Sequence, residues 1–122
     1  MIYSLLIYEA PGFADARSPA EREAALVAHR ELQADSKAAG SFRAATQLAE
    51  SGGSTVQQSE GTALVTDAPF AETKELFIGF YLVECGSLDD ALALAKRIPI
   101  SPQGRVDVRP AVWTESRSIE PE

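Results

Sequence analysis

The sequence predicts an α+β fold in which two helices cover one face of a sheet. Runs of strand-forming residues alternate with two helical segments along the 122 residues. Two of these runs, at residues 2–8 and 76–83, are apolar at both alternating sets of positions, which is typical of central strands covered on both faces. Each helical segment begins with a capping serine and ends at glycine or proline, so its bounds are well defined.

The length and composition indicate one globular domain. With 45% hydrophobic residues, the chain is long enough for one core, and we expect a domain at residues 1–114 and a polar tail at 115–122. Eighteen acidic and eleven basic residues give a net charge of −7, which disfavours nucleic acid and anionic membranes as partners. The apolar start is too short to span a membrane and lacks signal-peptide features, which predicts a soluble cytoplasmic protein. The chain has one cysteine and one histidine, too few for a zinc site of the usual Cys/His type, so we predict no metal site.

The first strand, at residues 2–8, is broken by Pro11-Gly12. A capping box then predicts the start of a helix, with Ser18 as the N-cap and Glu21 reaching back to it. Gly40 predicts its end, because glycine readily adopts the left-handed conformation that terminates helices. We therefore expect a helix from residue 19 to about residue 39.

The middle of the chain predicts four further strands, two of which form a hairpin. A weaker strand is expected at residues 42–48, followed by a hairpin of residues 55–58 and 62–66 around Glu60-Gly61. The longest strand signal covers residues 76–83, where Gly79 indicates a bulge or a close approach of another backbone.

A second helix is predicted after Ser87, which stands at its N-cap. Its apolar residues fall on one stripe, and Pro99 and Pro102 are expected to end it. Residues 105–109 alternate polar and apolar, as a last strand would. The stripe consists of Leu88, Ala91, Leu92, Ala95 and Ile98.

This order of elements is a ferredoxin-like β-α-β-β-α-β unit with an inserted β-hairpin. One layer of helices leaves the second apolar face of the central strands in contact with water. An exposed apolar face of this kind usually has a partner, and the simplest partner is a second copy of the chain. We therefore predict a homodimer in which two sheets pack into a dimeric α+β barrel.

Several segments resemble the DGPF (DGPFAETKE) branch of the YCII-related family: TDAPFAETKE at 66–75, GFYLVE at 79–84, LDDA at 88–91 and GRVDVRP at 104–110. The similarity extends from the first strand to Trp113. Ala68 departs from the pattern, because the branch has glycine there. The resemblance implies a ferredoxin-like dimer, without a cofactor in most members.

A His/Asp pair has been proposed as the catalytic centre in the YCII branch, with the histidine about three turns before the glycine that ends the first helix. His29 occupies that place, eleven residues before Gly40, and Asp67 is our candidate for the aspartate. An imidazole with a pKa near 6.5 can transfer protons at neutral pH, which would suit isomerisation or hydrolysis. The alternatives are a His29 at the edge of the core, because it shares a helical stripe with Ala25 and Leu32, and an Asp67 that forms an Asx turn.

Five further residues are candidates for ligand binding, and each has a structural alternative. An aromatic ring after the turn can cover a ligand or seal the core, and charged residues near it can bind a ligand or form surface ion pairs. An arginine on the last strand can bind an anion or form the polar face of an edge strand, and a tyrosine on the central strand can line a cleft or pack in the core. These candidates are Phe70, Glu72, Lys74, Tyr81 and Arg109.

Two classes of function stay open at this point. One is a small-molecule binding protein or enzyme that uses a His/Asp pair and no metal. The other is a non-catalytic interaction or regulatory protein, such as an accessory protein of an alternative sigma factor, which the family resemblance suggests. An enzyme requires His29 in a cleft, whereas an interaction protein requires an exposed surface on the hairpin or tail.

Overall fold

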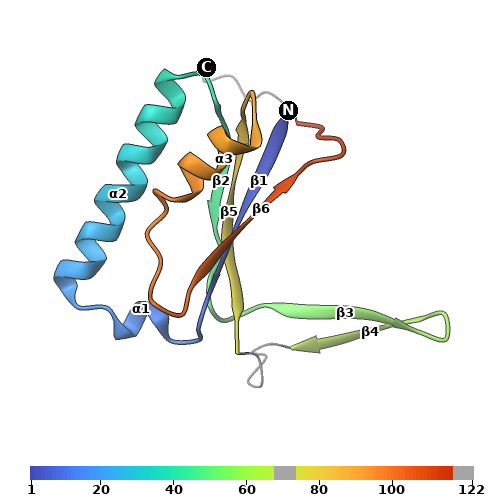
Figure 1. The fold of residues 1–122 in the computed structure, drawn as a ribbon. Coiled ribbons are helices and arrows are strands. Elements are labelled where there is room, and N and C mark those ends of the chain that lie inside the picture. Colours follow the sequence, from blue (N-terminus) through green and yellow to red (C-terminus); the bar gives the residue numbers. More distant parts are fainter. Residues whose placement is uncertain (68–73, 117–122) are drawn as a thin grey trace, which may run out of the picture.

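The computed structural model describes residues 1–67 and 74–116 of the chain. Four strands form an antiparallel sheet in the order β2-β5-β1-β6, and β3 and β4 form a separate two-stranded hairpin (Figure 1). The elements are β1 (Ile2–Glu9), α1 (Phe13–Ala16), α2 (Pro19–Ala38), β2 (Phe42–Gln47), β3 (Ser54–Ser59), β4 (Thr62–Asp67), β5 (Leu76–Glu84), α3 (Leu88–Ala95) and β6 (Arg105–Pro110).

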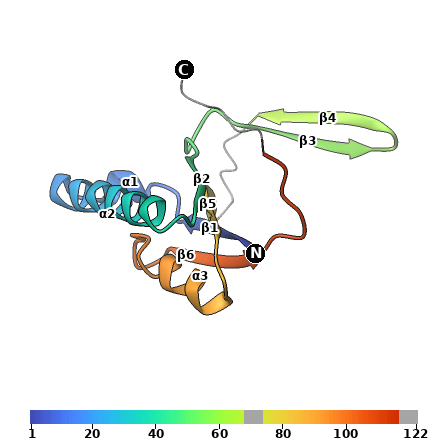
Figure 2. The same cartoon turned by 90° about the horizontal axis from the view of Figure 1, so that it is seen from above.

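The predicted order of elements is confirmed. The strands and helices form an antiparallel α+β arrangement that is compatible with a ferredoxin-like unit, and the strands with two apolar faces, β1 and β5, lie at its centre. The helices lie on one side of the sheet, and the hairpin projects on the other side (Figures 1 and 2). No helix within the described residues is long and apolar enough to cross a membrane.

Both ends of α2 follow the predicted capping chemistry. The Ser18 hydroxyl accepts a hydrogen bond from the Glu21 amide at 3.1 Å, and the Glu21 carboxylate accepts one from the Ser18 amide at 2.9 Å. At the other end, Gly40 has a φ of 77°, the left-handed conformation in which glycine is not strained. The helix is therefore fixed to the length that the sequence predicts.

The core lies between the helices and the sheet. Tyr3, Leu5, Ile7 and Glu9 are the buried residues of β1, so alternate residues of the strand face the helices. They pack with residues of β5, of α2 and of the segment around α3; these are Tyr81, Val83, Cys85, Leu32, Ala91, Ala95 and Ile98.

Both features predicted for Gly79, a bulge and a close approach of another backbone, are confirmed. The pairing of β1 with β5 shifts between Ile7 and Tyr8, so that Ile7 lies opposite Gly79 and Tyr8 lies opposite Phe77. A side chain at Gly79 would collide with the Thr46 carbonyl oxygen of β2. The shift also turns Phe77 to the face of Tyr8, where the two ring centroids are 5.4 Å apart.

Two details differ from the sequence-based expectation. A short helix, α1, follows Gly12 and buries Phe13, which the sequence did not predict. The second predicted helix, α3, ends at Ala95, four residues before Pro99, so proline does not end it. Only part of its apolar stripe is buried, because α3 meets the core through small alanines, and Leu88 is 48% exposed.

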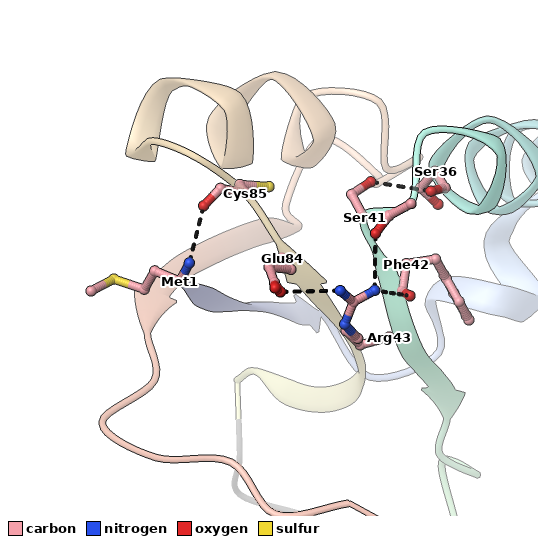
Figure 3. A network of polar contacts seen from close by, with 8 residues as sticks. Met1, Ser36, Ser41, Phe42, Arg43, Glu84 and Cys85 are labelled. Atoms are coloured by element: carbon pink, nitrogen blue, oxygen red, sulfur yellow. Dashed lines mark hydrogen bonds and ion pairs between the residues drawn. The ribbon is translucent and has the colours of Figure 1, made fainter. Parts of the chain in front are cut away.

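A polar network fixes the junction of α2 and β2 to the end of β5 (Figure 3). The Arg43 Nη1 donates to the carbonyl oxygens of Gly40 and Phe42, both at 2.9 Å, and Nη2 lies 3.0 Å from Glu84 Oε2. The Glu84 amide donates to the Ser41 carbonyl at 2.8 Å. The C-terminal end of α2 is therefore held to the sheet by backbone and ionic contacts.

Candidate functional site

A cavity of about 380 Å³ lies between α2, the segment around α1 and the helix-covered face of the sheet. This volume is within the range of small-molecule sites. Most of its lining is apolar, with walls formed by Ile7, Phe13, Ala25, Leu26, Ile78 and Pro99. Polar side chains from α2 and β5 also reach it, so the cavity combines apolar walls with a few hydrogen-bonding groups.

His29 lines the cavity and forms a hydrogen-bonded chain with two other polar residues. Its Nδ1 lies 2.8 Å from the Tyr81 hydroxyl, and Gln33 Nε2 lies 3.2 Å from the same oxygen. The rings of His29 and Tyr81 are nearly parallel, at an interplanar angle of 6° and a centroid separation of 5.9 Å. Gln33 stands four residues after His29, so both side chains leave the same face of α2.

The hydrogen bonds assign the tautomer of His29. The Gln33 amide can only donate through Nε2, so the Tyr81 oxygen accepts from it. Tyr81 is 3% exposed, and a buried hydroxyl proton needs an acceptor, which His29 Nδ1 supplies. The proton of neutral His29 is therefore on Nε2, for which the described residues provide no hydrogen-bond partner. His29 thus offers an N–H group to a ligand.

Burial sets the protonation states of His29 and Tyr81. Burial lowers the pKa of His29, and the nearby charge of Arg17 lowers this pKa further. Burial also raises the pKa of Tyr81, although the hydrogen bond from Gln33 acts in the opposite direction. At neutral pH, His29 is therefore uncharged and Tyr81 keeps its proton, as the tautomer assignment requires.

Two arginines line the cavity near the start of α2. Arg17 Nη2 lies 3.3 Å from Glu9 Oε2, so its charge is paired with a carboxylate. Arg22 donates through Nε to the Ala14 carbonyl oxygen at 3.2 Å, and it has no ion-pair partner among residues 1–67 and 74–116. Arg22 is therefore the cavity-lining cation that keeps both terminal amino groups available.

Glu9 is a buried carboxylate beside the cavity, with no exposed surface. It accepts hydrogen bonds from the Ser101 amide at 2.9 Å and from the Ser101 hydroxyl, in addition to its contact with Arg17. Gly104 passes close to it, and any side chain there would contact the carboxylate. Glu9 thus joins the end of β1 to the segment before α2 and to the segment that leads into β6.

The structure brings two of the predicted site residues together, namely His29 and Tyr81. Asp67 lies exposed at the end of β4, where its carboxylate accepts a hydrogen bond from the Ser54 hydroxyl at 3.4 Å, and the hydrogen bonds of the described residues do not join it to His29. The pairing of Asp67 with His29 stays a prediction. Lys74 and Arg109 are exposed and do not belong to the cavity lining. Phe70 and Glu72 lie outside the described residues.

Sequence reasoning missed four residues of the site: Gln33, Arg17, Arg22 and Glu9. Gln33 was detectable, because it stands four residues after His29 and shares its helical face. The arginines and Glu9 gave no comparable signal, because their positions depend on the path of the chain around α1. That short helix was itself not predicted.

The described residues contain neither a metal-binding cluster nor a reactive thiol. Within residues 1–67 and 74–116, no cluster of three or more His, Cys, Asp or Glu residues is arranged to hold a metal ion. Cys85 is buried, and burial raises the pKa of its thiol, which disfavours a reactive thiolate. Cys85 is part of the buried core.

Comparison with known proteins shows the family of this chain. The YCII-related domain matches residues 1–113 of the chain. The chain belongs to the YCII-related family. An uncharacterised protein of Rhizobium meliloti (strain 1021) is 35% identical to this YCII-related protein over 113 residues, which are 90% of this chain and 91% of the relative. Placement of this YCII-related chain in the DGPF branch is compatible with the match and stays a prediction.

Proposed function

We propose that the cavity binds a small molecule and that His29 transfers a proton to it from Nε2. The observation that carries this proposal is the hydrogen bond of His29 to Tyr81 in a cavity with apolar walls. In this tautomer His29 acts as a general acid: Nε2 gives its proton to the ligand while Nδ1 takes the hydroxyl proton of Tyr81. The reaction class is isomerisation or hydrolysis without a metal, because a proton given to a substrate oxygen can promote both.

In this proposal Tyr81 has the role for which an aspartate was expected from sequence. Its hydroxyl orients the imidazole and fixes the proton on Nε2, which then donates to a ligand oxygen. Gln33 holds the Tyr81 oxygen in place. His29 is the group that contacts the ligand, whereas Tyr81 and Gln33 position it. Variants of Tyr81 and Asp67 distinguish these two residues as partners of His29.

The test follows the single histidine by NMR. Because His29 is the only histidine, its imidazole gives one Hε1 signal that reports directly on the cavity. A library of neutral and charged small molecules is screened for compounds that shift this signal, and those compounds are assayed for conversion. We expect binders among them, and a library without any binder would contradict the proposal.

Three variants then identify the partner of His29 in any conversion that is found. His29→Ala should abolish turnover and leave the protein folded. Tyr81→Phe should reduce turnover if Tyr81 orients the imidazole, whereas Asp67→Asn should reduce it if the predicted His29 and Asp67 pair operates. Full activity of His29→Ala would refute the proposed chemistry.

We further propose that the protein is a homodimer through the face of the sheet that the helices leave open. Aromatic residues gather there: Tyr8 and Phe77 are in contact, and Phe77 and Phe80 stack with centroids 6.4 Å apart. Phe77 is 40% exposed, which is costly for so large an apolar residue. Packing two such faces would form the dimeric α+β barrel that the sequence predicts. A monomer in light scattering at micromolar concentration would exclude this assembly.

The alternative is an interaction or regulatory protein, and the β3–β4 hairpin favours it. The hairpin projects from the sheet (Figure 1) and exposes Val56, Leu64 and Val65 by 63%, 49% and 66%. An isolated two-stranded hairpin is only marginally stable, so a partner would stabilise it. Replacing residues 54–67 with a short glycine linker should leave ligand binding at His29 unchanged if the cavity carries the function. Loss of ligand binding in this variant would mean that the cavity does not bind ligand independently of the hairpin.

A further inference from the structure

The charges along the cavity are all of one sign among its described lining residues. Arg17 and Arg22 line it, and the described lining contains no aspartate or glutamate. This contrasts with the protein as a whole, which has a net charge of −7. The charge of Arg17 already acts on the cavity, because it contributes to the lowered pKa of His29. Because Glu9 beside the cavity compensates the charge of Arg17, the uncompensated positive charge of the described lining is that of Arg22.

The two arginines differ in what they can offer a ligand. Arg17 is engaged by Glu9, and its side chain is only 18% exposed. Arg22 is anchored through Nε to the Ala14 carbonyl, which restricts its guanidinium without consuming its terminal amino groups. An anchored guanidinium loses less freedom on binding than a mobile one, and its paired N–H groups match the two oxygens of a carboxylate.

The polar groups that line the cavity at His29 offer a donor as well. The Tyr81 hydroxyl occupies His29 Nδ1, so the group left for a ligand is the Nε2–H. Between this donor and Arg22 lie the apolar side chains of Ala25 and Leu26, and Ile78 contributes the sheet side of the wall. A ligand that satisfies this lining has an anionic group, an apolar body and an oxygen that accepts a hydrogen bond.

We propose that the cavity selects small organic carboxylates, with the carboxylate on Arg22 and an acceptor oxygen at His29 Nε2. This inference rests on the proposed function and names its ligand class. A carboxylate fits better than a phosphate, because one unpaired guanidinium and apolar walls would leave much of the charge of a phosphate unmatched. An oxygen acceptor next to the carboxylate would place the reacting bond beside His29.

The experiment compares benzoate with benzamide, which has nearly the same shape and no charge. Each is titrated into the protein while the His29 Hε1 signal is followed, and inorganic phosphate is titrated as a third probe. We expect benzoate to bind about tenfold or more tightly than benzamide, as the loss of a charge-assisted hydrogen-bond pair implies. We expect phosphate to bind more weakly than benzoate.

Two arginine variants on the same helix supply the control. Arg22→Gln should reduce the affinity for benzoate to that for benzamide and leave benzamide binding unchanged. Arg30→Gln removes the same charge from an exposed position of α2 outside the cavity lining and should leave both affinities unchanged. Thermal unfolding of each variant verifies that it is folded.

Several outcomes would overturn the carboxylate proposal without contradicting the proposal that the cavity binds a small molecule. Equal affinities for benzoate and benzamide would show a cavity that binds without selecting an anion. If phosphate bound as tightly as benzoate, the site would not be specific for carboxylates. If Arg22→Gln and Arg30→Gln lowered the affinity for benzoate equally, the preference for benzoate would come from the net charge of the protein. If neither organic probe moved the His29 signal, the carboxylate assignment would fail, and the library screen would decide separately whether the cavity binds any small molecule.

Discussion

The two ends of α2 meet the sheet in different ways. Toward its C-terminal end, Leu32 and Ser36 are almost completely buried, and the Ser36 hydroxyl donates to the Leu32 carbonyl at 2.7 Å. Toward its N-terminal end, Ala25 and Leu26 border a cavity, and Leu26 is 43% exposed. His29 stands between these two regions on the helix. One helix thus serves both as core and as the wall of a site.

This difference shows how a small domain can keep a cavity without losing its packing. The closed end is held by apolar burial and by the polar network around Arg43, whereas the open end is bounded by the ionic contacts of Glu9 and Arg17. We expect the closed end to contribute more to stability, which allows polar groups at and beside the open end. Three predictions follow from this division, from the largest effect to the smallest.

The largest effect is expected from truncating the buried side of α2. Leu32→Ala should lower the free energy of unfolding by about 2–5 kcal/mol, because it removes a fully buried side chain and leaves a void. Leu26→Ala, the same change at the open end, should cost less than about 1 kcal/mol. Urea unfolding of the two variants measures both values. Equal losses would mean that the two ends of α2 contribute equally to the core.

An intermediate effect is expected from the two Glu–Arg pairs at opposite ends of the sheet. Glu9→Gln should cost about 1–3 kcal/mol, because a buried group would lose charge-assisted hydrogen bonds from Arg17 and Ser101. Glu84→Gln breaks the exposed pair with Arg43 and should cost about 0–1 kcal/mol.

Thermal and urea unfolding of both glutamine variants test this contrast. The salt dependence supplies a second measure, because added salt should weaken the exposed pair more than the buried one. A Glu9→Gln variant as stable as the parent protein would show that Glu9 is not needed to hold the open end together.

The smallest effect is the dependence of stability on the charge of His29. Its pKa is lowered in the folded state, so between that value and about 6.5 the unfolded chain binds more protons than the folded one. The contribution of His29 is therefore present above pH 6.5 and is lost as the pH falls through the pKa of the folded state.

Comparison of the parent protein with His29→Gln isolates this term from the titration of carboxylates. The difference in their unfolding free energies should rise with pH in that window, and the NMR titration of His29 should give a pKa below 6.5. Arg17→Gln should raise this pKa, because it removes a positive neighbour. A His29 that titrates above 6.5 would contradict a desolvated imidazole.

Much of the fold could be predicted from the sequence, because helix caps and turns are determined by residues that are close together in the chain. The capping box at Ser18, the glycine at position 40 and the Glu60-Gly61 turn all appear where expected, with Glu60 and Gly61 at positive φ. The end of α3 was placed too late, because Pro99 marks only where a helix cannot continue. The sequence does not show where the chain leaves the helical conformation earlier.

The site was predictable only in part, because its partners come from distant segments. His29 and Tyr81 were both candidates, but they lie 52 residues apart, and the sequence did not indicate that they would meet. Asp67 lies at the end of a strand, as expected, and its pairing with His29 stays a prediction. Glu9 was not a candidate, because its burial depends on contacts with Ser101 and Arg17 from other segments.

Gly79 also limits how mutations can change the ligand preference of this cavity during evolution. It forms part of the sheet side of the cavity, and its place against Thr46 admits no side chain. Mutation therefore cannot fill or reshape the cavity from this point without first disturbing the pairing of β2 with β5. New specificities in related chains with this bulge are expected to arise instead on the helix, at positions equivalent to Arg22 and Leu26. A mutational scan of this protein would find one wall of the cavity constrained and the other open to variation.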